Sequence, residues 1–170
     1  MCKGNILKAA ENYSIAHCVG KDLLLSDGIA RNIKETFSLE ETINEMKEDP
    51  IEVGDILPIQ QDKNYILNIV TKELSRDKPT WNNFKKSIKR LPEICSDLGI
   101  SKICMPRIGS GLDGLNWPKV LKLLEGIFEN EDIEVYILDL KDSEQQEYNK
   151  SVNNKRFKKD ITKKKTNLYS

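Results

Sequence analysis

The chain has 170 residues, with 27 basic and 27 acidic side chains, so its formal net charge at pH 7 is zero. Charged residues make up 32% and aromatic residues 6% of the sequence, which is ordinary for a soluble protein, and no apolar run is long enough to span a membrane. The length supports one domain with a good core and a short tail, and the composition excludes a membrane-spanning protein.

The first half of the chain alternates between strand and helix patterns. Hydrophobic periodicity predicts a strand at 13–19, helices at 29–37 and 38–47, and strands at 55–59 and 65–71 joined by a polar turn at 60–64. Ser38 and Glu41 have the Ser-x-x-Glu spacing of a capping box at the start of the second helix.

The second half continues the alternation. The pattern predicts a long helix at 80–98, a strand at 103–106, a helix over 117–128 and a last strand at 133–140. Asn116 is the expected N-cap of the last helix, with Pro118 in its first turn. Such alternation indicates an α/β fold, with a mixed, mostly parallel sheet between two layers of helices. In such sheets, ligands bind beyond the carboxyl ends of the strands.

Two glycine-containing loops each lead from a strand into a helix. The loop at 107–116 carries Gly109, Gly111 and Gly114 with one carboxylate, Asp113. Glycines let main-chain N–H groups approach phosphate oxygens, and a helix N-terminus favours an anion. The spacing fits neither the dinucleotide fingerprint nor the P-loop, and a glycine-rich connection without a ligand stays open as the alternative.

The other loop, at 20–28, could grip a diphosphate from the opposite side. It contains three consecutive leucines, Leu23 to Leu25, an unusual run for a surface loop. They either pack under a ligand or bury into the core.

Several separated motifs together make the chain resemble a macrodomain, in particular the terminal ADP-ribose protein glycohydrolase group. They are His17-Cys18, residues 26–30, Thr71-Lys72, residues 78–80 and residues 105–113. The resemblance covers about residues 3–140. It implies a three-layer α/β/α sandwich that holds ADP-ribose across the carboxyl edge of its sheet.

The resemblance places the catalytic pair of that group on Lys72 and Asp113. There, the lysine attacks the anomeric carbon of the distal ribose, and the aspartate acts as general acid and base and resolves the lysyl adduct. Both side chains are capable of this chemistry. Taken alone, Lys72 could equally be an exposed lysine at a strand end, and Asp113 a turn residue.

The resemblance also implies a set of ligand-binding residues: Asn5, Ile6, His17, Gly20, Ser26, Gly28, Ile29, Thr71, Arg107, Ile108, Gly109, Ser110, Gly111, Leu112 and Leu138. Three of them depart from the family pattern. Asn5 stands where the group has an acid at the end of its first strand, Gly20 replaces a small hydroxyl residue, and Ser26 replaces a glycine. With few residues before Gly4, the sheet is expected to lack one edge strand. His17, the only histidine, has no triad partners in the sequence and is expected to be hydrogen-bonded at a strand end.

The function implied is a hydrolase that removes mono-ADP-ribose from glutamate and other acidic side chains of proteins, and that deacylates O-acyl-ADP-ribose. The alternative is a non-catalytic module that reads ADP-ribose, and a third candidate is a nucleic-acid-associated domain. We expect no cofactor, no metal and no membrane contact. The expected partners of this monomer are ADP-ribose and mono-ADP-ribosylated proteins.

The neutral total hides a basic C-terminal segment. Residues 149–170 contain eight Lys or Arg and one acid, Asp160, so the first 148 residues carry an excess of seven negative charges. We expect this segment to be disordered or loosely helical. It is either a solvated extension, or a nuclear address or weak nucleic-acid contact. The chain therefore divides into a macrodomain at 1–140 and a basic tail at 141–170.

The cysteines predict the compartment. Cys2, Cys18, Cys95 and Cys104 are scattered without paired spacing, which is typical of free thiols and gives no support for a zinc site. The N-terminal residues lack the apolar core of a signal peptide. We expect an intracellular protein, cytoplasmic and/or nuclear.

Overall fold

The computed structural model describes residues 6, 8–26 and 28–138. Asn5, Cys2 and the basic segment 141–170 lie outside the described residues, and the side chain of Leu112 is also not described.

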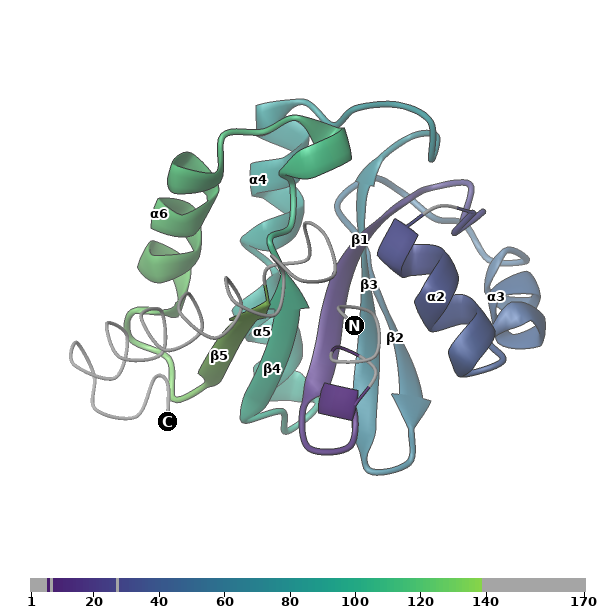
Figure 1. Cartoon of the computed structure of the whole chain (residues 1–170), viewed down its shortest axis with the longest axis horizontal. Coiled ribbons are helices and arrows are strands. Elements are labelled where there is room, and N and C mark those ends of the chain that lie inside the picture. Colours follow the sequence, from purple (N-terminus) through teal and green to yellow (C-terminus); the bar gives the residue numbers. More distant parts are fainter. Residues whose placement is uncertain (1–5, 7, 27, 139–170) are drawn as a thin grey trace, which may run out of the picture.

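The described residues form one five-stranded sheet (Figure 1). Its strands are β1 (Ser14–Gly20), β2 (Ile56–Gln61), β3 (Asn64–Lys72), β4 (Lys102–Pro106) and β5 (Glu134–Leu138). They lie in the order β2-β3-β1-β4-β5, with β2 antiparallel to β3 and all other neighbours parallel. The strands β1, β3, β4 and β5 therefore end at one edge of the sheet, here called the carboxyl edge.

Helices cover both faces of this sheet, as the sequence predicts. Helices α2 (Gly28–Thr36) and α3 (Glu40–Met46) pack on one face, and α4 (Trp81–Ile88), α5 (Leu91–Asp97) and α6 (Trp117–Phe128) on the other (Figure 1). Alternate strand residues serve the two cores, because successive side chains point to opposite faces. Leu67 and Ile69 join the α4–α6 core, whereas Ile66 and Val70 join the α2–α3 core. This is the expected three-layer α/β/α sandwich.

The single long helix predicted at 80–98 is wrong, because the segment forms two helices. Helix α4 ends at Ile88, and α5 begins at Leu91 with Pro92 in its first turn. A proline ring clashes with the carbonyl of the residue four positions earlier, which here is Ile88. Apolar residues continue on the same face across the break, so the periodicity alone does not reveal it.

The capping predictions have mixed outcomes. The side chain of Asn116 accepts a hydrogen bond from the Lys119 N–H at 3.0 Å, so Asn116 is the N-cap of α6 as predicted. The capping box at Ser38 is wrong, since α3 begins at Glu40, its N-cap is Leu39 and no side chain caps it. Ser38 has a φ of 54°, outside the extended conformation in which a serine caps a helix.

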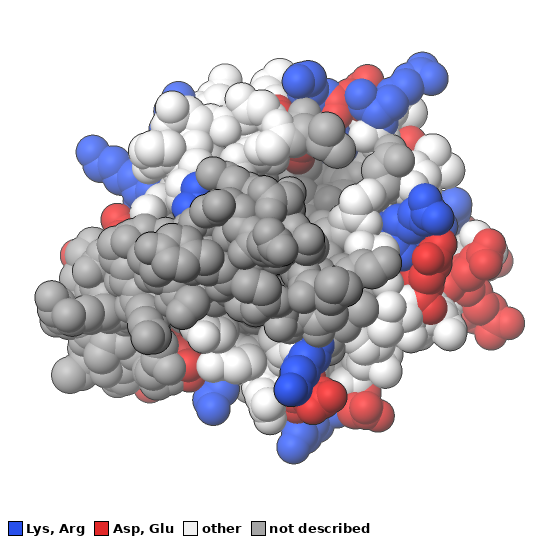
Figure 2. Space-filling view, viewed as in Figure 1, with Lys and Arg blue, Asp and Glu red and all other residues white. Residues whose placement is uncertain are grey.

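Ile6 lies in a short helical segment, and the described residues before β1 contribute no strand to the sheet. Cys18, Cys95 and Cys104 form no disulfide bond with one another, as predicted. No described helix is both long and apolar enough to cross a membrane. On the face shown in Figure 2, described basic and acidic side chains are interspersed around the rim.

Candidate active site

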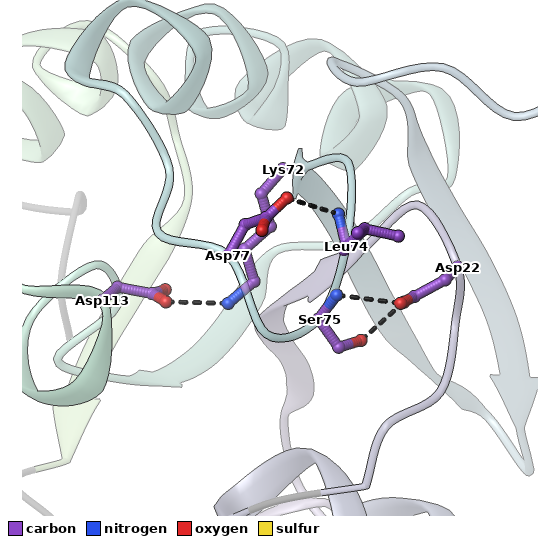
Figure 3. Close-up of polar contacts among 6 residues, drawn as sticks. All are labelled: Asp22, Lys72, Leu74, Ser75, Asp77 and Asp113. Carbon is purple, nitrogen blue, oxygen red and sulfur yellow. Dashed lines mark hydrogen bonds and ion pairs between the residues drawn. The ribbon is translucent and has the colours of Figure 1, made fainter.

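The predicted catalytic pair comes together at the carboxyl edge of the sheet. Lys72 is the last residue of β3, and Asp113 ends a short 3-10 helix (Gly111–Asp113) in the loop after β4. The Nζ of Lys72 donates a hydrogen bond to Oδ1 of Asp113 at 2.9 Å (Figure 3). Their side chains are only 13% and 16% exposed, so the two charges are paired where water has limited access. This excludes the alternative that Lys72 is simply an exposed lysine at a strand end.

A local irregularity in β3 immediately precedes Lys72. Strand β1 pairs with β3 in regular register up to Val19, which lies opposite Val70, but Gly20 lies opposite Lys72. Thr71 is therefore an extra residue in β3, as in a β-bulge. Bulges change the direction of the residues that follow them and are common beside active sites. The Thr71 side chain is buried, and its hydroxyl has no hydrogen-bond partner among the described residues.

The loop from Arg107 to Asp113 packs closely on the core below it. Gly109 has a φ of 78°, and a Cβ at this position would lie 2.8 Å from the ring of Phe84. Ser110 donates its hydroxyl to the Arg107 carbonyl at 2.8 Å, and Ile108 is buried. Gly111 has a φ of 69°, and a Cβ at this position would have no neighbouring atom within 4 Å, so its main chain faces open space. Such a loop can present main-chain N–H groups to an anion.

Next to this loop, two tryptophan rings at the N-termini of α4 and α6 each contact a basic side chain. The guanidinium of Arg107 lies 5.3 Å from the ring centre of Trp117, and the ammonium of Lys119 lies 4.2 Å from that of Trp81. Both contacts are within the range of cation–π attraction. They hold two positive charges close to the start of α4 and α6.

Of the three consecutive leucines in the first loop, two are buried and one is exposed. Leu23 and Leu25 have φ values of 52° and 47° and are buried in the α2–α3 core, whereas Leu24 between them is 50% exposed. Positive φ is unfavourable for a leucine, so the burial of both side chains must compensate for strain. Ser26 and Gly28 are exposed at the start of α2, and Ile29 is half-buried.

His17 lies inside the sheet and not at the site's surface. Its Nε2 is 2.6 Å from Oδ1 of Asn68, whose amide nitrogen donates to the Leu57 carbonyl at 2.9 Å. The amide oxygen must therefore accept, so Nε2 of His17 carries the proton. Nδ1 is buried with no partner among the described residues. Burial lowers the pKa of His17 to about 4, against the opposing effect of the Asn68 hydrogen bond, so the ring is neutral at pH 7.

The predicted ligand residues thus fall into two groups. Thr71, Gly20 and the loop at 107–113 adjoin the Lys72–Asp113 pair, and Ser26, Gly28 and Ile29 lie at the start of α2. Ile6, His17 and Leu138 are instead buried on the α2–α3 side, with exposed fractions of 3% or less. The described residues contain no cluster of three potential metal ligands.

Nothing in the sequence gives Cys18 a role at the site beyond its place in the His17-Cys18 motif, and Asn68, the partner of His17, is not among the predicted residues. Cys18 is half-buried in β1 and interacts electrostatically with Asp113 and Lys72. Burial raises the pKa of its thiol, with Asp113 adding to the effect, so Cys18 is not a thiolate nucleophile. The one feature of the sequence that could have indicated a buried hydrogen bond at Asn68 is that it is a polar residue within the apolar strand β3.

Comparison with known proteins gives a consistent result. A family model described as Macro domain matches residues 16–124. A human protein named ADP-ribose glycohydrolase OARD1 is 33% identical over 139 residues, which cover 81% of this chain and 89% of that protein.

Two solved structures share the fold. The macrodomain of Thermus aquaticus DarG has a TM-score of 0.66 and 22% identity, and the match covers 73% of this chain and 87% of that one. Thermosipho africanus DarTG, solved in complex with ADP-ribose, has a TM-score of 0.66 and 16% identity, with 83% of this chain and 41% of that chain covered.

Proposed function

The chain belongs to the macrodomain family, and on that premise we propose that it is a hydrolase that releases ADP-ribose from acidic side chains of modified proteins. One observation carries the catalytic part of the proposal, the amine–carboxylate pair of Lys72 and Asp113 at 2.9 Å on the carboxyl edge. A module that only binds ADP-ribose needs no such pair. The name of the human relative, an ADP-ribose glycohydrolase, supports the same reaction class.

The first proposed step forms a bond between the protein and the sugar. Asp113 accepts a proton from the Lys72 ammonium, and the resulting amine attacks the anomeric carbon of the distal ribose. A C–N bond forms, the bond from that carbon to the glutamate oxygen breaks, and the glutamate leaves as a carboxylate. Asp113 then gives its proton to solvent.

The second proposed step releases the sugar. Asp113 accepts a proton from a water molecule whose oxygen attacks the same carbon, and the C–N bond breaks. Lys72 is regenerated as an amine and regains its proton from Asp113, so the ion pair is restored. The main chain of residues 107–113 would hold the diphosphate during both steps.

The test is release of ADP-ribose from a glutamate-modified protein by the full-length chain and its variants. Lys72→Ala should abolish release while ADP-ribose still binds, as measured by calorimetry. Lys63→Ala, in the exposed turn between β2 and β3, is the matched control and should behave as wild type. O-acetyl-ADP-ribose, the second substrate class that we propose, is assayed in parallel.

Asp113→Ala separates the two steps. Without the carboxylate, water must take the proton from the Lys72 ammonium, so attack is slower but the nucleophile is still present. The adduct is then no longer resolved, so intact mass should reveal a species heavier by one ADP-ribosyl group, mapping to Lys72. If wild-type protein binds ADP-ribose but releases none from the modified substrate, the catalytic proposal is wrong and the domain is a reader. If it does not bind ADP-ribose, both functions are excluded.

A further inference from the structure

The carboxylate of Asp22 connects the first glycine loop to the turn that follows Lys72. Its Oδ2 accepts a hydrogen bond from the Ser75 main-chain N–H at 2.9 Å, and its Oδ1 accepts one from the Ser75 hydroxyl at 2.5 Å (Figure 3). The Leu24 N–H, on the same loop as Asp22, also points to Oδ1 at 3.4 Å. One carboxylate thus joins two segments that are 53 residues apart in sequence.

The two segments also touch at the level of the main chain. A Cβ at Gly20 would lie 2.5 Å from the Ser75 nitrogen and 2.8 Å from the Leu74 carbonyl carbon. Contacts this short do not occur, so the turn after Lys72 approaches β1 closely only because position 20 is a glycine. This approach places Ser75 within reach of the Asp22 carboxylate.

The segment from Lys72 to Ser75 is therefore anchored at both ends to the first loop. At one end, the Lys21 N–H donates to the Lys72 carbonyl at 2.8 Å. At the other end, Ser75 is held by Asp22. A further contact, from the Leu74 N–H to Asp77 at 3.3 Å, lies within the turn itself and is exposed. Among the described residues, the Lys21 and Asp22 contacts tie the main chain of this segment to the first loop, and the Lys72 side chain is in addition paired with Asp113.

Asp22 is suited to such an anchor because it is charged at neutral pH. Partial burial has the largest single effect and favours the neutral acid, but the hydrogen bonds from Ser75 and Leu24 and the charge of Lys47 together lower the pKa of Asp22. Hydrogen bonds to an ionised carboxylate are stronger than those between neutral groups.

We propose that Asp22 is a positioning residue for Lys72: by clamping Ser75, it fixes the end of β3 after the Thr71 bulge, so that the Lys72 amine is held against Asp113. This inference rests on the proposed hydrolase function. Reaction rates are steeply sensitive to the position of a nucleophile, whereas binding of ADP-ribose also draws on the separate loop at 107–113. Loss of the clamp should therefore reduce turnover far more than affinity.

The test compares three variants of the full-length protein. Asp22→Asn replaces one acceptor oxygen by a donor, so one contact with Ser75 is lost; we expect kcat to fall by about 10- to 100-fold. The dissociation constant for ADP-ribose should stay within about threefold, the scale of a change well under 1 kcal/mol. Ser75→Ala should show a smaller loss of kcat, and Ser75→Thr, which keeps the hydroxyl, should restore it.

Asp55→Asn is the matched control. Asp55 also accepts a main-chain hydrogen bond within its own loop, from the Glu52 N–H at 2.8 Å, but it does not contact the segment after Lys72. Asp55→Asn should therefore leave kcat unchanged. A wild-type kcat for Asp22→Asn would overturn the inference, and so would a parallel loss of kcat and affinity with lowered thermal stability, which would indicate a general structural role.

A second measurement does not depend on turnover. Lys72 is 13% exposed, so it should react slowly with an amine-reactive ester, as followed by peptide mass spectrometry. Asp22→Asn should increase the labelling of Lys72 relative to Lys63, whereas Asp55→Asn should not. If wild-type protein has no hydrolase activity, the proposed function fails, and the labelling result still decides the positioning role: unchanged labelling overturns it.

Discussion

Replacing His17 by glutamine should flatten the pH dependence of stability in the weakly acidic range. His17 is buried and neutral, with its pKa lowered by burial from 6.5 to about 4. In the unfolded chain the ring titrates near its ordinary pKa. Between these two values the unfolded state binds a proton that the folded state does not, so stability falls as the pH falls.

The size of the effect follows from the two pKa values. Above about pH 7.5 both states are neutral and His17 contributes no pH dependence. Between about pH 8 and about pH 5, the linkage relation gives a loss of about 2 kcal/mol in the free energy of unfolding from this residue. Against a total stability of about 5–15 kcal/mol, this change is measurable.

Urea unfolding of wild-type and His17→Gln protein at a series of pH values is the assay. Glutamine does not titrate and keeps an N–H donor for Asn68, so carboxylates contribute equally to both proteins and the difference in slope isolates the histidine. Parallel pH profiles for the two proteins would refute the reasoning. They would mean that the ring of His17 is protonated in the folded state at the same pH as in the unfolded chain.

Three further predictions concern the loops and the tail. Gly109→Ala should lower stability by about 1–3 kcal/mol in thermal unfolding, since it forces a side chain into a φ of 78° and against the Phe84 ring at 2.8 Å; an unchanged melting temperature would contradict this. Gly111→Glu should weaken ADP-ribose binding, because it places a carboxylate beside the diphosphate. Gly99→Glu is the control, since Gly99 has a similar φ of 70° and open space around it but lies at the opposite edge of the sheet, and its affinity should be unchanged. Equal affinities of the two variants for ADP-ribose would exclude the 107–113 loop as the phosphate-binding loop. Removal of residues 149–170 should leave ADP-ribose affinity within a few-fold and reduce any salt-sensitive binding of RNA; a large loss of ADP-ribose affinity would show that the segment acts at the site.

The layers of the fold follow from local patterns in the sequence. The continuous buried run of β3 and the apolar stripes of α4 and α6 are both visible in the sequence, and the N-cap at Asn116 is a local interaction across three residues. Periodicity cannot show where a stripe is interrupted, which is why it does not reveal the break before Pro92. The Ser38 motif fails as a predictor because a capping box also requires a main-chain conformation that the residue types do not specify.

The contacts of the site cannot be predicted from local sequence patterns, because they join residues that are far apart in the chain. Lys72 and Asp113 are 41 residues apart, and nothing in their local sequence indicates that they pair; the family resemblance supplies the prediction. The Asp22–Ser75 and His17–Asn68 contacts, 53 and 51 residues apart, have no such guide. Each depends on the order of strands in the sheet, which brings β1 next to β3.

The contact between Gly109 and Phe84 has a consequence for how the domain can change over time. Phe84 is fully buried in the α4–α6 core, and the same ring forms the floor on which the 107–113 loop rests. A smaller apolar residue there would lower the stability of the core and would also leave a space into which the loop could sink. A change at the buried Phe84 would then alter ligand affinity without direct contact with the ligand. The residue at this position of α4 would therefore be constrained by the geometry of the binding loop as well as by the stability of the fold.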